Sequence, residues 1–135
     1  MFTEDTCCGF PLYDMGHMDG MKDMAAETLA LFEKYKPDVV LTSCPGCFEA
    51  IGHFWKEKLG LSHDYQVMDI SQFLVSRIEG KCAEIDKRVT WHDPCVLGRH
   101  LGEYEAPRTV INSVPGIDFV EMAEHHDKSA CCAYA

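Results

Sequence analysis

Two cysteines separated by two residues stand in the segment Cys44-Pro45-Gly46-Cys47. They follow a short apolar run and open a predicted helix, where unpaired backbone amides and the helix dipole favour a thiolate over a thiol. Such a pair is compatible with half of a metal site, with a dithiol redox centre of thioredoxin type, or with two buried cysteines that have no chemical role. The pair by itself leaves these three interpretations open.

Adjacent cysteines extend the pattern in both halves of the chain. A spacer of 35 residues separates the pair Cys7-Cys8 from Cys44, and a spacer of 35 residues separates Cys95 from the pair Cys131-Cys132. Neighbouring cysteines seldom bond to each other, because the ring that they would close is strained. Four soft thiolates from two loops match the ligand set of an iron–sulfur cluster or of a structural zinc. The repeated spacing therefore favours metal binding over a dithiol enzyme.

The candidate ligands are the seven cysteines of these motifs: Cys7, Cys8, Cys44, Cys47, Cys95, Cys131 and Cys132. Cys82 fits no motif, and we expect it to be a structural or free thiol.

Other polar residues near these cysteines have simpler explanations. His92 is a candidate to support the ligand Cys95, but a histidine at the end of a strand is as often a capping or surface group. His125 and His126 are candidates to replace a missing thiolate, although we expect solvated loop positions. Arg99 fits an anion contact or a surface ion pair equally well.

Strands alternate with helices along the chain, and this alternation positions the cysteines. Apolar runs predict four strands, at Val39–Thr42, Tyr65–Met68, Arg88–His92 and Ile117–Met122. Periodicity and breakers predict helices at about 19–36, 47–59, 70–78 and 105–113. The alternation predicts an α/β fold, a Rossmann-like layer with a mostly parallel sheet of about four strands flanked by helices. Cysteines that follow strands are then expected at the carboxyl ends of the strands, on one edge of the sheet.

Length and charge exclude several classes of function. The chain has 135 residues, enough for one domain, and 12 Lys+Arg against 22 Asp+Glu give a net charge of −10. This charge repels polyanions, so neither nucleic acid nor an anionic membrane surface is an expected partner. No signal peptide or transmembrane segment is visible, which predicts a cytoplasmic protein. Persistent disulfides are rare in the cytosol, so the cysteines point to metal, iron–sulfur or redox roles.

The two cysteine patterns resemble the cysteine-rich CCG domain of heterodisulfide reductase subunits of the B and D types, also found in iron–sulfur subunits of glycolate and lactate oxidoreductases. Its motif is a lone cysteine, a vicinal pair and a C-x2-C pair, separated by long spacers and normally present twice. Segments 6–11 (TCCGFP) and 42–47 (TSCPGC) resemble the last four cysteines of a first copy. Segment 92–100 (HDPCVLGRH) and the pair Cys131-Cys132 resemble the first three of a second copy.

The resemblance implies one CCG-type domain over residues 1–135, with the end of one copy at about 1–60 and the start of the second at about 88–135. The lone cysteine of the first copy would precede Met1, and the closing C-x2-C of the second would follow Ala135. We therefore expect a chain truncated at both ends. Ala133-Tyr134-Ala135 replaces the glycine-rich continuation of the family.

The resemblance also implies a pair of metal centres. In heterodisulfide reductases each copy holds a [4Fe–4S] cluster of the non-cubane type, and in some relatives one copy holds zinc. The cysteines of segments 6–11 and 42–47 would ligate the first centre with one ligand absent. The three cysteines of the second copy would leave that centre incomplete.

The expected function is an iron–sulfur electron-transfer module of a heterodisulfide-reductase-like or 2-hydroxy-acid oxidoreductase complex, as a subunit or fragment of the enzyme. The partners implied by the resemblance are other oxidoreductase subunits, of ferredoxin-like or flavoprotein type. Two alternatives remain: a zinc-stabilised structural or interaction module that uses the same cysteines, and a dithiol redox protein that uses the C-x2-C pair.

Overall fold

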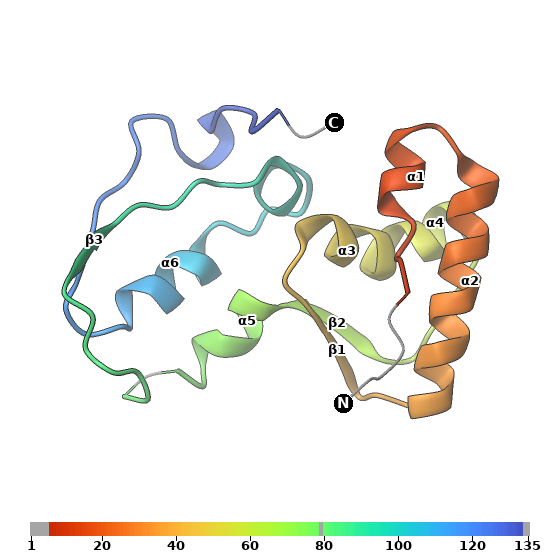
Figure 1. Ribbon diagram of the computed structural model, residues 1–135, viewed down its shortest axis with the longest axis horizontal. Helices are drawn as coiled ribbons and strands as arrows, with labels where there is room; N and C mark the ends of the chain where they lie inside the picture. Colours follow the sequence, from red (N-terminus) through yellow and green to blue (C-terminus); the bar gives the residue numbers. More distant parts are fainter. Residues whose placement is uncertain (1–5, 79, 134–135) are drawn as a thin grey trace. The chain divides into compact units, whose positions relative to one another are not determined.

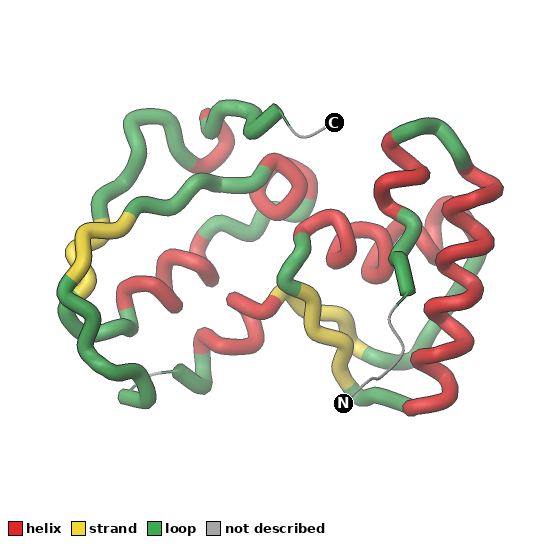
Figure 2. Tube along the Cα trace, viewed as in Figure 1, coloured by secondary structure: helices red, strands yellow, loops and turns green. Residues whose placement is uncertain are grey.

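A computed structural model describes residues 6–78 and 80–133 (Figure 1). The chain divides after Met68 into two compact units, and each unit is described by itself. Each combines helices with a two-stranded parallel sheet, which confirms the predicted α/β class (Figure 2). In the described part of the chain, no helix has both the length and the apolar character needed to cross a membrane.

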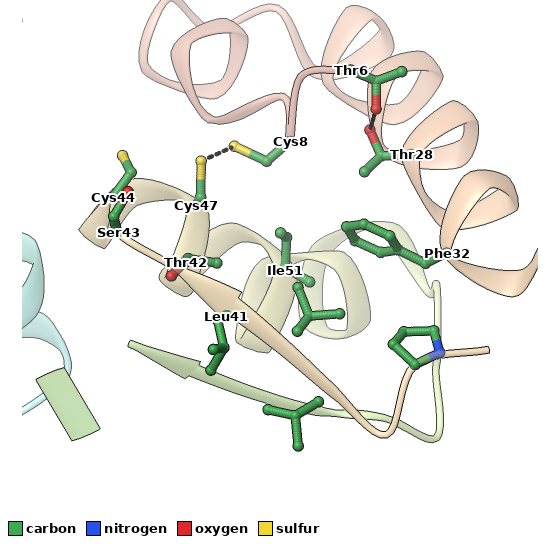
Figure 3. A pocket seen from close by; sticks show the side chains of 13 residues that line it. Thr6, Cys8, Thr28, Phe32, Leu41, Thr42, Ser43, Cys44, Cys47 and Ile51 are labelled. Atoms are coloured by element: carbon green, nitrogen blue, oxygen red, sulfur yellow. Dashed lines mark hydrogen bonds between the residues drawn. The ribbon is translucent and has the colours of Figure 1, made fainter. Parts of the chain in front are cut away.

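The first unit begins with the short helix α1, Phe10–Asp14, and the long helix α2, Met18–Tyr35. Strand β1, Val39–Thr42, leads into an unbroken helical run made of α3, Pro45–Glu49, the π-helical turn η1, Ala50–Phe54, and α4, Trp55–Leu59. Strand β2, Gln66–Asp69, then runs parallel to β1 (Figure 3). This unit is therefore one βαβ crossover preceded by a helical hairpin.

Local sequence explains the ends of these elements. Pro45 occupies the first turn of α3, where its fixed φ is favourable and its missing N–H is not needed. Gly60 ends α4 in the left-handed conformation, with φ 68°. The predicted ranges of α2 and β1 are confirmed, whereas the helix after β1 starts at Pro45 rather than at Cys47.

The second unit repeats the crossover with shorter elements. They are α5, Ile70–Val75, β3, Lys87–Val89, the π-helical turn η2, Val96–His100, α6, Glu105–Asn112, β4, Ile117–Phe119, and the 3-10 turn η3, His126–Lys128. Strands β3 and β4 pair in parallel over three residues each, with Arg88 opposite Asp118. Asp69 caps α5, since its side chain accepts the amide of Ser71 and Gln72 accepts the amide of Asp69.

The four predicted strands all exist, but they form two sheets of two strands. Alternation of strands and helices identifies βαβ crossovers, yet it does not determine which crossovers share a sheet. Cys44 follows β1 and Cys95 lies beyond β3. The expected shared sheet edge is therefore replaced by one strand end in each unit.

The core of the first unit contains a cysteine. Buried residues from four segments pack together: Cys8, Met21, Ala25, Ala50, Ile51 and Trp55. Of these, Met21 and Trp55 are the largest side chains with no exposed surface. The loop before α1 is thus part of the core, although no periodicity marks it in the sequence.

Gly9 allows that loop to approach α2. Its φ is 86°, and a Cβ there would lie 2.9 Å from both the backbone oxygen and the Cγ of Met21. Gly60 has a similar φ of 68°, but a Cβ there would meet no atom within 4 Å. Gly9 is therefore required by both conformation and space, and Gly60 by conformation alone.

We expect Gly9→Ala to destabilise the protein more than the matched substitution Gly60→Ala. Both add the left-handed penalty of roughly 1–2 kcal/mol, and Gly9→Ala adds an overpacking cost of about 1–3 kcal/mol because backbone lies against the new atom. Urea unfolding of the two variants measures the difference in free energy. Equal losses would show that the loop moves away from α2 at no cost.

Candidate metal centres

The first candidate centre is built around two sulfur atoms that meet inside the first unit. Cys8 is only 6% exposed, and its Sγ lies 3.2 Å from the Sγ of Cys47 (Figure 3). Loops 39 residues apart in sequence thus bring two thiols into contact. The vicinal pair and the C-x2-C pair therefore belong to one structural site.

The shared hydrogen bond divides the acidities of the two thiols. The hydrogen bond with Cys47 lowers the pKa of Cys8 to about 7, despite burial, which acts in the opposite direction. The same bond and burial raise the pKa of Cys47 above its ordinary value. One proton is therefore held between the two sulfurs after the first has left, and a metal that binds both must displace it.

The other two cysteines of this site are exposed. The backbone N–H of Gly9 donates to the Sγ of Cys7 at 3.4 Å, and Cys44 caps the N-terminus of α3. Gly46 lets the two loops pack, because a Cβ there would lie 2.8 Å from the ring of Phe10. Exposed and buried thiols thus alternate in both pairs, since neighbouring side chains of a loop point in different directions.

Convergence of all four thiols on one metal remains a prediction. Among the described residues, no three His, Cys, Asp or Glu side chains are already grouped as a metal site. The donor set nevertheless fits a thiophilic metal, because the two sulfurs in contact leave a proton to displace and the two exposed thiols flank them. Hard cations, which prefer oxygen, are not suited to this set.

A cavity of about 540 Å³ opens beside the sulfur atoms (Figure 3). Most of one wall is strand β1, and Phe32 and Ile51 extend its apolar lining. Cys8, Cys44 and Cys47 also line it. The thiols are therefore reachable from outside even though Cys8 is buried.

In the second unit, the segment that carries Cys131 and Cys132 is held against the turn that follows Cys95. Cys95 caps η2, and η2 packs against η3, which precedes the vicinal pair. Arg99 of η2 donates to the backbone oxygen of Ser129 at 2.6 Å and to that of Asp127 at 3.3 Å. Arg99 therefore binds the chain itself, in contrast to the anion contact or ion pair considered from the sequence.

A buried charge cluster reinforces this arrangement. Arg108 on α6 is 6% exposed and makes paired hydrogen bonds to both carboxylate oxygens of Asp93, at 2.8 and 2.7 Å, and of Glu121, at 2.6 and 3.0 Å. The guanidinium group holds the pKa of both carboxyl groups below their ordinary values. Asp93 also accepts the backbone N–H of His126 at 2.6 Å. The cluster thus joins the loop before Cys95 to the segment before Cys131.

The histidines lie in hydrogen-bonded positions. The Nδ1 atoms of His125 and His126 are 2.6 Å apart, and Nε2 of His126 lies 3.1 Å from a carboxylate oxygen of Glu105. Nδ1 of His92 lies 3.5 Å from the hydroxyl of Ser129. These contacts account for the three side chains within the described structure, and metal ligation by them stays untested.

Comparison with known proteins follows the two cysteine segments. Residues 1–52 and 89–135 match the family described as the CCG cysteine-rich domain. The chain belongs to this family. The matched segments contain all seven motif cysteines of this CCG domain and leave Cys82 outside.

Relatives of the CCG domain include the D-type subunit of the dihydromethanophenazine:CoB–CoM heterodisulfide reductase of Methanosarcina barkeri, 37% identical over 96% of this chain and 33% of the relative. An uncharacterized iron-sulfur protein of Methanococcus maripaludis is 35% identical over 86% of this chain and 22% of the relative. Lactate utilization protein A of Oceanobacillus iheyensis is 31% identical over 96% of this chain and 55% of the relative.

The CCG domain described here spans only about a third of the length of the heterodisulfide reductase subunits that it matches. No solved structure is significantly similar to it.

The sequence analysis missed three residues that hold the cysteine segments of this CCG domain. Thr28 and Trp55 donate hydrogen bonds to the backbone of the pair Cys7-Cys8, and Arg108 anchors the loop before Cys95. Thr28 and Trp55 lie at positions that the helical periodicity assigns to the core, which was their only signal. An arginine in the predicted helix 105–113 gave no sign that it is buried.

Proposed function

We propose that this chain is an iron–sulfur electron-transfer module of a multi-subunit oxidoreductase of the heterodisulfide reductase type. In this proposal Cys7, Cys8, Cys44 and Cys47 ligate a first cluster of the [4Fe–4S] class, and Cys95, Cys131 and Cys132 contribute to a second. Because the chain covers only part of its relatives, the activity belongs to the larger assembly.

The observation that carries the proposal is the contact between Cys8 and Cys47. A thiol pair joined at 3.2 Å in an apolar core, with two more cysteines beside it, has no structural requirement in a reduced protein. Membership of the CCG family and the iron-sulfur description of a relative support iron rather than another metal.

An iron–sulfur cluster supplies one-electron transfer at low potential when it is bound. The chain's own residues supply the rest. Cys8 and Cys47 release their shared proton as they become thiolate ligands, and the buried position of Cys8 limits water around its sulfur. The adjoining cavity of about 540 Å³ offers a small substrate access to the exposed cysteine side.

Two alternatives are supported by separate observations. The 55% coverage of lactate utilization protein A favours a 2-hydroxy-acid oxidoreductase as the larger assembly. The Cys₄ donor set by itself is equally suited to a structural zinc, which would make the chain an interaction module without redox work.

The proposed partners are the other subunits of the complex, of ferredoxin-like or flavoprotein type. Their names as subunits support this for the relatives. We propose a cytoplasmic location, because thiolate ligands must stay reduced until the metal binds.

Anaerobic reconstitution of the full chain with iron and sulfide tests the proposal. We expect a brown protein that binds iron and sulfide in equal amounts and bleaches on reduction. Reconstitution with zinc in competition, followed by metal analysis, separates the alternatives.

A colourless protein that keeps zinc in the presence of iron and sulfide would replace the electron-transfer function with a structural one. Disulfide reductase activity in a metal-free sample would favour the dithiol interpretation.

A further inference from the structure

Both backbone carbonyl groups of the vicinal cysteine pair are bound by buried side chains. The hydroxyl of Thr28 on α2 donates to the oxygen of Cys7 at 2.9 Å. The indole N–H of Trp55 on α4 donates to the oxygen of Cys8 at 3.0 Å. Thr28 is 4% exposed and Trp55 is fully buried, so neither bond competes with water.

The hydroxyl of Thr28 is itself held in place. Its Oγ1 lies 2.6 Å from the Oγ1 of Thr6. Because the proton of Thr28 goes to the oxygen of Cys7, the hydroxyl of Thr6 donates to Thr28 (Figure 3). The chain Thr6–Thr28–Cys7 thereby fixes the orientation of the Cys7–Cys8 peptide.

Trp55 has a second effect through the planarity of the next peptide. The carbonyl of Cys8 and the N–H of Gly9 belong to one trans peptide, so they point in opposite directions. With the carbonyl bound to Trp55, the N–H of Gly9 is directed to the Sγ of Cys7 at 3.4 Å. Trp55 thus aims the donor, and Thr28 holds the backbone of the acceptor.

Hydrogen bonds to cluster sulfur raise the reduction potential, because they stabilise the more negatively charged reduced state. We propose that Thr28 and Trp55 are positioning residues that raise the reduction potential of the first centre by directing the Gly9 N–H to the Cys7 sulfur. This inference rests on the proposed function, since it concerns the cluster that Cys7 would ligate.

The test compares Thr28→Val with a matched control in the same unit. Thr42→Val removes another buried threonine hydroxyl, and the Oγ1 of Thr42 has no hydrogen-bond partner among the described residues. Both substitutions preserve shape. Thr28→Ser keeps the hydroxyl and serves as the rescue, while Trp55→Phe removes the indole donor.

Spectroelectrochemical titration of the reconstituted full chain gives the first readout. We expect Thr28→Val and Trp55→Phe to shift the potential to more negative values with iron content unchanged. Thr28→Ser and Thr42→Val should give the wild-type potential. A wild-type potential in both Thr28→Val and Trp55→Phe would overturn the inference, as would an equal shift in Thr42→Val.

Amide hydrogen exchange at Gly9, measured by NMR in the reduced metal-free chain, gives a readout that needs no cluster. We expect faster exchange in Thr28→Val and Trp55→Phe and no change in Thr42→Val. Unchanged exchange in the first two variants would refute the positioning role. A wild-type chain that takes up no iron would refute the proposed function instead, and the exchange data would still decide the role of the two side chains.

Discussion

Cys8→Ser is expected to abolish metal binding at the first centre, whereas Cys82→Ser leaves it unchanged. Cys8 contacts Cys47 at 3.2 Å and is the buried member of the vicinal pair. A serine hydroxyl is a hard donor that stays protonated near neutral pH, so it does not replace a thiolate toward iron or zinc. Metal and sulfide analysis after anaerobic reconstitution measures the loss.

Cys82 is the matched control because it lies outside both matched segments and is a free, partly exposed thiol. Circular dichroism of the metal-free variants shows whether the buried serine disturbs the fold. Full metal content in a folded Cys8→Ser variant would contradict ligation by Cys8 and, with it, the proposed first centre.

Arg108→Met is expected to lower the free energy of unfolding by about 3–5 kcal/mol, because it leaves carboxylates of a buried ion cluster without their partner. Asp93 is 3% exposed and binds Arg108 through both oxygens. Arg108→Lys keeps the charge but cannot make two paired contacts, so we expect an intermediate loss. Urea unfolding, followed by fluorescence, measures these differences.

The control for this substitution is Arg88→Met, which removes the exposed ion pair with Asp118 at 2.7 Å in the same unit. An exposed pair of this kind contributes about 0–1 kcal/mol, so the control should change stability little. Similar losses in Arg108→Met and Arg88→Met would mean that the buried cluster does not hold the loops of the second unit together.

Much of the fold could be predicted from periodicity. The apolar spacing of residues 19–36 identified α2 to within a residue, and the β-branched run Val39–Thr42 identified β1. The division of four strands into two sheets could not be predicted. Each strand pair is joined by its own helical crossover, and nothing in a local pattern states which edge a third strand will use.

The short helix α1 and the two π-helical turns were also beyond the sequence. Helix α1 has five residues, too few for a periodic pattern. It exists because Gly9 allows a left-handed turn and Phe10 packs over Gly46. Such elements depend on tertiary contacts rather than on propensity.

The sequence by itself determined which residues can bind metal, because softness of the donor and spacing are properties of the chain. It also placed Cys44 at a helix start, since a strand-like run and Pro45 are local signals. Which sulfurs meet, and which of them is buried, was decided by packing. Two adjacent cysteines carry the same local signal, yet Cys8 is buried and Cys7 is exposed.

Only the tertiary structure identified the groups that hold these cysteines. Thr28 binds Cys7 across 21 positions, Trp55 binds Cys8 across 47, and Arg108 binds Asp93 across 15. A hydrogen bond depends on distance and direction between atoms, and no spacing rule links residues so far apart in sequence. The sequence therefore determined the ligand set, and folding decided how its backbone and charges are fixed.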